Sequence, residues 1–100
     1  MPYEKQFLAL SHPLRQHILT RLSADPLSVK DLTDGTDASQ PVISQHLKVL
    51  KDTGFVDVTA KGTRNIYRAN PDALAQLRLY LEQHWTAALT SLTDEKEDLK

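Results

Sequence analysis

The stretch from residue 39 to residue 55, SQPVISQHLKVLKDTGF, constrains the fold of this chain more than any other part. Ser39 is a favourable N-cap residue, and Pro41 follows in the first helical turn, where a missing N–H is tolerated. Gly54 suits the C′ position just beyond the end of a helix. A helix that begins near residue 40 and ends just before Gly54 is therefore predicted.

The two faces of this predicted helix differ in chemistry. Apolar residues recur at i, i+4 and i+7, the spacing of a face that packs against a core: Ile43, Leu47 and Leu50. The opposite face is small, amide-bearing or basic: Gln40, Ser44, Gln45, Lys48 and Lys51. Amides and hydroxyls can meet base edges in a major groove, and ammonium groups can meet phosphates. The pattern therefore indicates a helix that reads DNA.

The composition permits this interpretation and excludes others. One hundred residues suffice for one domain, and the absence of cysteine excludes disulfides, thiolate metal sites and a cysteine nucleophile. No apolar run approaches the roughly 18 residues of a membrane span, and the first residues lack the regions of a signal peptide. A cytoplasmic protein without a membrane partner is expected. Without a phosphate loop or nucleophile motif, neither an enzyme nor a cofactor is predicted.

The net charge of −1 conceals an uneven distribution. Residues 39–68 carry five basic and two acidic side chains, a net charge of +3, whereas residues 69–100 carry three basic and six acidic ones, a net charge of −3. The basic charge thus lies on the segment whose other chemistry indicates DNA.

The segments on either side complete a helix-turn-helix unit with a hairpin. Short helices are predicted over residues 3–10, from Ser11 to about residue 23, and over residues 28–35. The last of these, a turn and the amphipathic helix form the helix-turn-helix. The following segment, 55–70, alternates apolar and polar residues about a turn at Lys61-Gly62, which predicts a β-hairpin. Beside the helix, this hairpin is expected to be a wing that contacts DNA; the alternative is a solvated surface hairpin.

A long C-terminal helix begins at Asn70-Pro71-Asp72. Its apolar residues recur every three or four positions from Leu74 to Leu92. A stripe of that length exceeds what a small domain needs, so a partner is expected; the alternative is that it packs back on its own domain. We predict one domain over residues 1–93 for DNA binding and dimerisation, followed by a charged tail over residues 94–100.

Four segments together resemble the ArsR-type winged-helix repressors: LSHPLRQHIL (10–19), LSVKDL (27–32), SQPVISQHLKVLKDTGFV (39–56) and KGTRNIYRAN (61–70). The resemblance implies a mainly α-helical winged helix-turn-helix fold with a β-hairpin wing. It also implies a homodimer joined through the first and last helices, an inverted-repeat operator in a promoter, and repression relieved by a signal. The apolar residues expected at the dimer interface are Phe7, Leu77, Leu81, Trp85 and Leu89.

The metal sites of that family are not expected here. Ser28 and Lys30 stand where its thiol site has two cysteines, and a lysine repels a cation. The family's other pattern falls on residues of which only the first could bind metal: Asp72, Leu74, Trp85 and Ala88. A set with the same spacing lies out of register: Glu82, His84, Glu95 and Asp98. No metal site is predicted, and the sequence names no effector.

The residues expected to contact DNA divide by chemistry. Gln40, Ser44 and Gln45 are predicted to read bases. The predicted phosphate ligands are Ser39, Lys48, Lys51, Lys61 and Arg64, the last from the wing. His46, at the edge of the apolar arc, either packs inside the fold or contacts DNA. We predict a homodimeric transcriptional repressor that binds double-stranded DNA; the alternative is a winged-helix protein-interaction module that has lost DNA binding.

Overall fold

The computed structural model describes the backbone of residues 3–98 and the side chains of residues 3–91. The elements of this part are α1 (Glu4–Leu10), α2 (Pro13–Ala24), α3 (Val29–Asp34), α4 (Gln40–Asp52), β1 (Val56–Lys61), β2 (Arg64–Ala69) and α5 (Pro71–Asp98). This order is the predicted winged helix-turn-helix, with α3 and α4 as its two helices. The segment 94–100, predicted as a charged tail, lies outside the described side chains.

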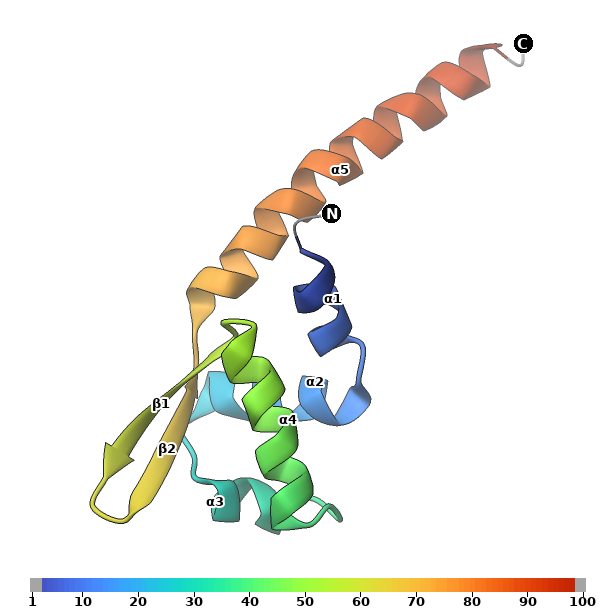
Figure 1. Ribbon diagram of the computed structural model, residues 1–100. Coiled ribbons are helices and arrows are strands. Elements are labelled where there is room, and N and C mark those ends of the chain that lie inside the picture. Colours follow the sequence, from blue (N-terminus) through green and yellow to red (C-terminus); the bar gives the residue numbers. More distant parts are fainter. Residues whose placement is uncertain (1–2, 99–100) are drawn as a thin grey trace.

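Helix α5 leaves the body formed by the other elements and runs past α1 into open space (Figure 1). The molecule measures 65 × 25 × 23 Å, with a radius of gyration of 17.8 Å. A compact domain of this length has a radius of gyration of about 13 Å. The projecting helix accounts for the excess, so a large part of its surface is uncovered in a single chain.

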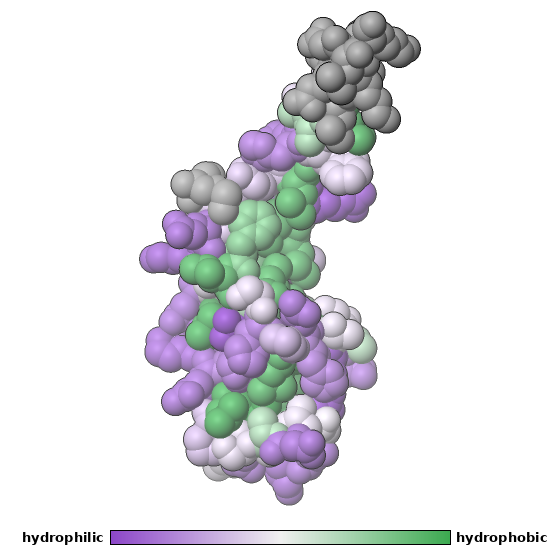
Figure 2. Space-filling model, turned by 90° about the vertical axis from the view of Figure 1, so that its right-hand side faces the viewer, coloured by the Kyte–Doolittle hydropathy of each residue, from purple (hydrophilic) through white to green (hydrophobic). Residues whose placement is uncertain are grey.

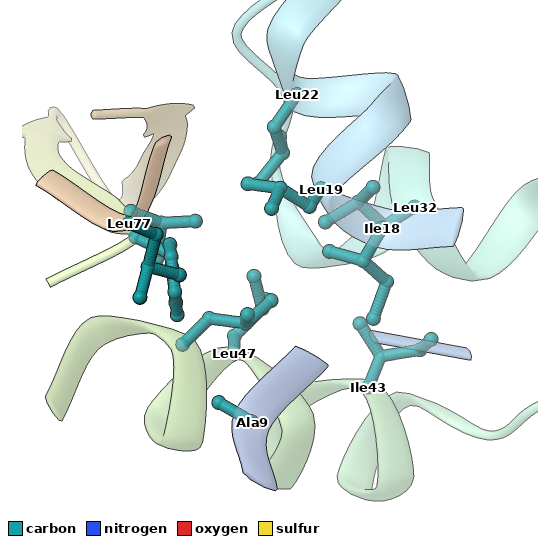
Figure 3. Packing of buried hydrophobic residues seen from close by; sticks show 11 residues of the cluster. Ala9, Ile18, Leu19, Leu22, Leu32, Ile43, Leu47 and Leu77 are labelled. Atoms are coloured by element: carbon teal, nitrogen blue, oxygen red, sulfur yellow. The ribbon is translucent and has the colours of Figure 1, made fainter. Parts of the chain in front are cut away.

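The core lies where α2, α3 and α4 meet the base of the hairpin and the start of α5 (Figure 3). Helix α4 contributes all three residues of its predicted apolar stripe, each with no exposed surface: Ile43, Leu47 and Leu50. Phe55, just after the helix, is also fully buried. Burying one such side chain stabilises a fold by about 1.5–3 kcal/mol, so these residues fix the position of α4 and leave its polar face outside.

Helix α2 begins at Pro13, within the stretch expected to start it. Its N-cap is His12, whose Nδ1 accepts a hydrogen bond from the Leu14 N–H at 3.1 Å. The Ser11 hydroxyl donates instead to the Leu8 carbonyl at 2.6 Å, at the end of α1. Only two residues separate the helices, so each of them satisfies one helix end.

The end of α4 is set by backbone geometry. Gly54 has a φ of +86°, in the left-handed region that favours glycine. The Phe55 N–H donates to the Leu50 carbonyl at 2.9 Å and the Gly54 N–H to the Lys51 carbonyl at 3.0 Å. This pair of bonds is a Schellman motif. It directs the chain from α4 straight into the hairpin, which places the wing beside the helix (Figure 1).

The hairpin is a regular antiparallel ladder from Val56↔Ala69 at its base to Lys61↔Arg64 at its tip. Gly62 has a φ of +61° and no other described residue of the loop has a positive φ, as in a two-residue type II′ turn. Backbone bonds between Leu27 and Tyr67, of 2.9 and 2.8 Å, tie the hairpin to the segment before α3. Within the described residues, none of the helices is long and apolar enough to cross a membrane.

Candidate DNA-binding interface

The polar face of α4 is solvent-exposed along its whole length. All five residues predicted on that face are exposed: Gln40, Ser44, Gln45, Lys48 and Lys51. The opposite stripe is fully buried, so the helix cannot rotate without giving up its core packing. The structure therefore presents hydroxyl, amide and ammonium groups together on a rigid helix, as reading a groove requires.

The start of α4 offers hydrogen-bond donors to an anion. Ser39 occupies the N-cap position, but its side chain makes no capping hydrogen bond and is exposed. A helix N-terminus attracts phosphate through its unpaired N–H groups and its dipole. The Ser39 hydroxyl and the neighbouring backbone N–H groups can thus donate hydrogen bonds to the same phosphate, consistent with the predicted role of Ser39.

Lys48 is engaged within its own helix. Its ammonium lies 2.7 Å from the Asp52 carboxylate, and both side chains are more than half exposed. The hydrogen bond from Lys48 and the charge of Lys51 lower the pKa of Asp52 below its ordinary value. Exposed pairs of this kind contribute little to stability. Lys48 can therefore leave Asp52 for a DNA phosphate at small cost.

The two cations at the wing tip behave differently. Lys61 and Arg64 face each other in the last pair of the ladder, and both are exposed. The Arg64 guanidinium turns back to α3, where it donates to the Ser28 hydroxyl at 2.7 Å and lies 3.4 Å from the Asp31 carboxylate. Among the described residues Lys61 thus has no ion pair with an acidic side chain, whereas Arg64 is bound to Ser28 and Asp31.

His46 is half-buried and packs against residues of α2 and the segment before it. Arg15 of α2 approaches its Nδ1 at 3.1 Å, and its ring lies 4.4 Å from that of His12. Burial, and then the neighbouring His12 and Arg15, lower the pKa of His46 below 6.5. Of the two alternatives for His46, this geometry favours packing over a DNA contact.

Arg15 is a residue that the sequence reasoning missed. Its guanidinium also donates to the carbonyls of Ala9 at 2.6 Å and Leu8 at 3.1 Å, at the end of α1. It therefore connects α1 to α4 from its place on α2. No local sequence signal marks it, because its partners lie 6 to 31 residues away.

A second candidate surface lies between α1 and α5. A groove of about 640 Å³ is lined almost entirely by apolar atoms of the two helices. Three of the five residues predicted for the dimer interface line its sides: Phe7, which is half-buried, and Leu81 and Trp85, which are exposed at its rim. Figure 2 shows the apolar band that this face of the molecule carries upward along α5.

The other two predicted interface residues, Leu77 and Leu89, differ from these three and from each other in exposure and position. Leu77 is 4% exposed and belongs to the core of its own subunit, so it forms the floor of the groove. Leu89 lies beyond the groove and is 47% exposed. Tyr80 of α5 packs against the start of α1. The centroid of its ring lies 5.0 Å from that of Tyr3 and 5.9 Å from that of Phe7.

The positions considered for metal binding carry other contacts. Ser28 is 5% exposed and forms a capping box with Asp31 at the start of α3. Glu82 accepts a hydrogen bond from Arg78 at 2.9 Å. Glu95 and Asp98 lie outside the described side chains. Among the residues that are described, no three histidine or acidic side chains gather as a metal site would require.

A helix-turn-helix with an adjoining wing and an exposed polar second helix defines a winged-helix DNA-binding protein. A helix-turn-helix domain family matches residues 10–59. The chain is 41% identical over 87 residues to the HTH-type transcriptional regulator Rv2034 of Mycobacterium tuberculosis, covering 87% of this chain and 81% of that protein. It is 36% identical over 76 residues to the HTH-type transcriptional repressor SmtB of the same species, covering 76% of this chain and 56% of SmtB.

Solved structures agree with the fold. An ArsR-like transcriptional regulator from Rhodococcus sp. RHA1 superposes with a TM-score of 0.77 at 30% identity, covering 88% of this chain and 86% of that one. The homodimeric winged helix-turn-helix domain of Mb0332 from Mycobacterium bovis gives a TM-score of 0.66 at 26% identity, covering 80% and 78%. The chain belongs to the ArsR-type family of winged helix-turn-helix transcriptional regulators, and it is a DNA-binding regulator.

Proposed function

We propose that the protein is a homodimeric transcriptional repressor that binds an inverted repeat in a promoter. The observation that carries the proposal is the exposed polar face of α4, held rigid by a fully buried apolar stripe on the other side. Gln40, Ser44 and Gln45 read base edges in the major groove, where a glutamine amide suits adenine. Ser39, Lys48, Lys51 and Lys61 bind the backbone on either side.

The dimer forms through α1 and α5 of each subunit. The groove between these helices is apolar, and Trp85 at its rim is 67% exposed in the single chain. A tryptophan of that exposure on an apolar band indicates a surface that another protein covers. A second copy supplies the same band, so a two-fold interface can bury both. A two-fold dimer places two copies of α4 on one duplex, which matches an inverted repeat.

One relative supports repression, because SmtB is a transcriptional repressor. A structural neighbour supports dimerisation, because the winged helix-turn-helix domain of Mb0332 is homodimeric. A protein of this kind blocks transcription by occupying its operator until a signal releases it. The competing function, a protein-interaction module without DNA binding, predicts no affinity for any duplex.

One titration series tests the proposal. A labelled duplex, selected by the protein from a random-sequence library, is titrated at several salt concentrations. Three lysines per subunit on phosphates predict a steep dependence, with a slope of about −0.9 for each contact in the logarithm of affinity against that of salt. The matched control is Lys5→Ala, on α1, which leaves the slope unchanged. A flat dependence, or no selected sequence, refutes DNA binding.

A further inference from the structure

Arg64 holds a position that a simple DNA ligand does not need. It is the first residue of β2 and lies opposite Lys61 at the tip of the wing. Its guanidinium reaches back to Ser28, which is 5% exposed, at 2.7 Å, and to Asp31 at 3.4 Å. Of two neighbouring cations at the tip, Arg64 is therefore bound to the helix-turn-helix, whereas Lys61 has no such ion pair among the residues that the structure describes.

The helix that Arg64 reaches is too short to be stable alone. Helix α3 has six residues, and isolated helices below about 12 residues are marginal in water. Its N-terminus is held by the capping box of Ser28 and Asp31, with both hydrogen bonds at 3.2 Å. Arg21 of α2 donates to the carbonyls of Asp31 and Leu32, at 3.2 and 3.1 Å. Arg21 of α2 and Arg64 of the wing thus both hydrogen-bond to α3 or its N-cap, and α3 leads into the turn before α4.

The wing is attached to this region at two points. The backbone bonds between Leu27 and Tyr67 fix its base. Arg64, three residues nearer the tip, fixes it again through Ser28 and Asp31. With one attachment a two-stranded hairpin can swing about its base, because such a hairpin is only marginally rigid by itself. With two attachments its direction relative to α3 is defined.

We propose that Arg64 is a positioning residue for DNA binding, which holds the wing against α3 so that Lys61 meets the DNA backbone. This inference rests on the proposed function, and it gives Arg64 a role other than that of the phosphate ligand that the sequence predicts. The lowered pKa of Asp31, caused first by its hydrogen bonds with Ser28 and then by the charge of Arg64, keeps that carboxylate ionised for the contact.

The first test separates charge from reach. Arg64→Lys keeps the charge, but the lysine is one bond shorter and lacks the planar fork, so it cannot hold Ser28 in the same way. Binding to the selected duplex should weaken roughly two- to fivefold, the range of an exposed pair, with the salt slope unchanged. Lys61→Ala, its ladder neighbour, should make the slope shallower by about 0.9 in each subunit, because one phosphate ligand is removed. Thermal unfolding of each variant confirms that titrations use folded protein.

The second test removes the partner instead of the arginine. In Asp31→Asn the amide oxygen can still accept the Ser28 N–H, but the charge that holds Arg64 is gone. The positioning role predicts weaker binding to the selected duplex, although an acid has been removed. Asp34→Asn, at the other end of the same helix, is the control for loss of negative charge and should bind as well as the unaltered protein or better.

The outcomes are distinct. Weaker binding by both Arg64→Lys and Asp31→Asn at constant slope supports the positioning role. Binding by Arg64→Lys equal to that of the unaltered protein, together with tighter binding by Asp31→Asn than by Asp34→Asn, overturns it, because a freed Arg64 would then be a phosphate ligand. An unaltered protein that binds no duplex refutes the proposed function itself, which is recognisable before any variant is made.

Discussion

Helices α4 and α5 are both amphipathic, but only α4 has its apolar face covered by the rest of its own chain. Helix α4 has 13 residues, and its whole apolar stripe has no exposed surface. Helix α5 has 28 residues, and among its described side chains, up to residue 91, only Leu77 is buried. Further along, Leu81 is 52% and Trp85 67% exposed. The same periodicity therefore serves intramolecular packing in one helix and an uncovered surface in the other.

The difference matches the two tasks that we propose for these helices, DNA reading by α4 and dimerisation by α5. A reading helix must present polar groups at a fixed angle, so its apolar face has to be fully covered by its own subunit. A dimerisation helix must keep apolar surface for a second copy, so its packing in one subunit is incomplete. Figure 1 shows α5 projecting away from α4, the proposed reading helix, so substitutions in the exposed part of α5 should act on assembly first.

The largest expected effect tests whether the apolar face of α4 is fully covered by its own subunit. Leu47→Ala removes a fully buried side chain and should lower the free energy of unfolding by about 2–5 kcal/mol, through reduced burial and the cavity left behind. Val42→Ala, on the same helix but 38% exposed, should cost no more than about 0.5 kcal/mol. Urea unfolding at a fixed protein concentration measures both. Equal effects would mean that the core does not define the orientation of α4.

The next prediction tests whether the exposed apolar surface of α5 is covered by a second copy of the chain. Trp85→Ala removes the large aromatic side chain at the rim of the groove and should weaken the dimer by about 2 kcal/mol or more. Sedimentation equilibrium should show a dissociation constant raised by roughly thirtyfold, and operator affinity should fall because a monomer engages one half-site. Gln83→Ala, also exposed on α5, is the control. An unaltered chain that stays monomeric at micromolar concentration contradicts the interface.

The sequence predicted the elements whose signals are local. The buried stripe of α4, Gly54 at its end and the turn at Gly62 follow from spacing and from glycine's access to positive φ. Which helix end Ser11 caps and which end His12 caps could not be predicted, because two helix ends meet within two residues.

What the sequence could not predict are contacts between distant side chains. Arg64 and Ser28 are 36 residues apart, and Arg15 and His46 are 31 apart. An arginine on a wing beside a basic helix was therefore interpreted as a phosphate ligand, which is the simplest role for its charge. Only the fold shows that a buried serine and a carboxylate lie within its reach.

A third prediction concerns the polar face of α4. Gln45→Ala should cost about 1–3 kcal/mol on the selected duplex and little on random DNA, because it removes a base contact and no charge. Lys51→Ala should weaken both by similar factors, since phosphates carry no sequence information. Fluorescence anisotropy with both duplexes measures the ratio. If Gln45→Ala binds the selected duplex normally, another part of α4 reads the bases.

The smallest expected effect concerns the contact that joins α4 to α2. The Arg15 hydrogen bond to His46 requires an unprotonated Nδ1, and burial lowers the pKa of His46 in the folded protein. The unfolded chain, with a histidine pKa of about 6.5, therefore takes up the proton first as the pH falls. Stability should be level above roughly pH 7.5, decrease as the pH falls through about 6.5, and level off below the folded-state pKa.

Replacing His46 by glutamine isolates this effect, because an amide oxygen can accept from Arg15 without titrating. Urea unfolding between pH 8 and pH 5, as a series of roughly half-unit steps, should show a shallower loss of stability in His46→Gln than in the unaltered protein. His17→Gln, on the exposed side of α2, should keep the full pH dependence. Parallel curves for all three proteins would mean that His46 is as accessible to protons in the fold as in the unfolded chain. In that case α4 would be less completely enclosed by its own subunit than its buried stripe indicates.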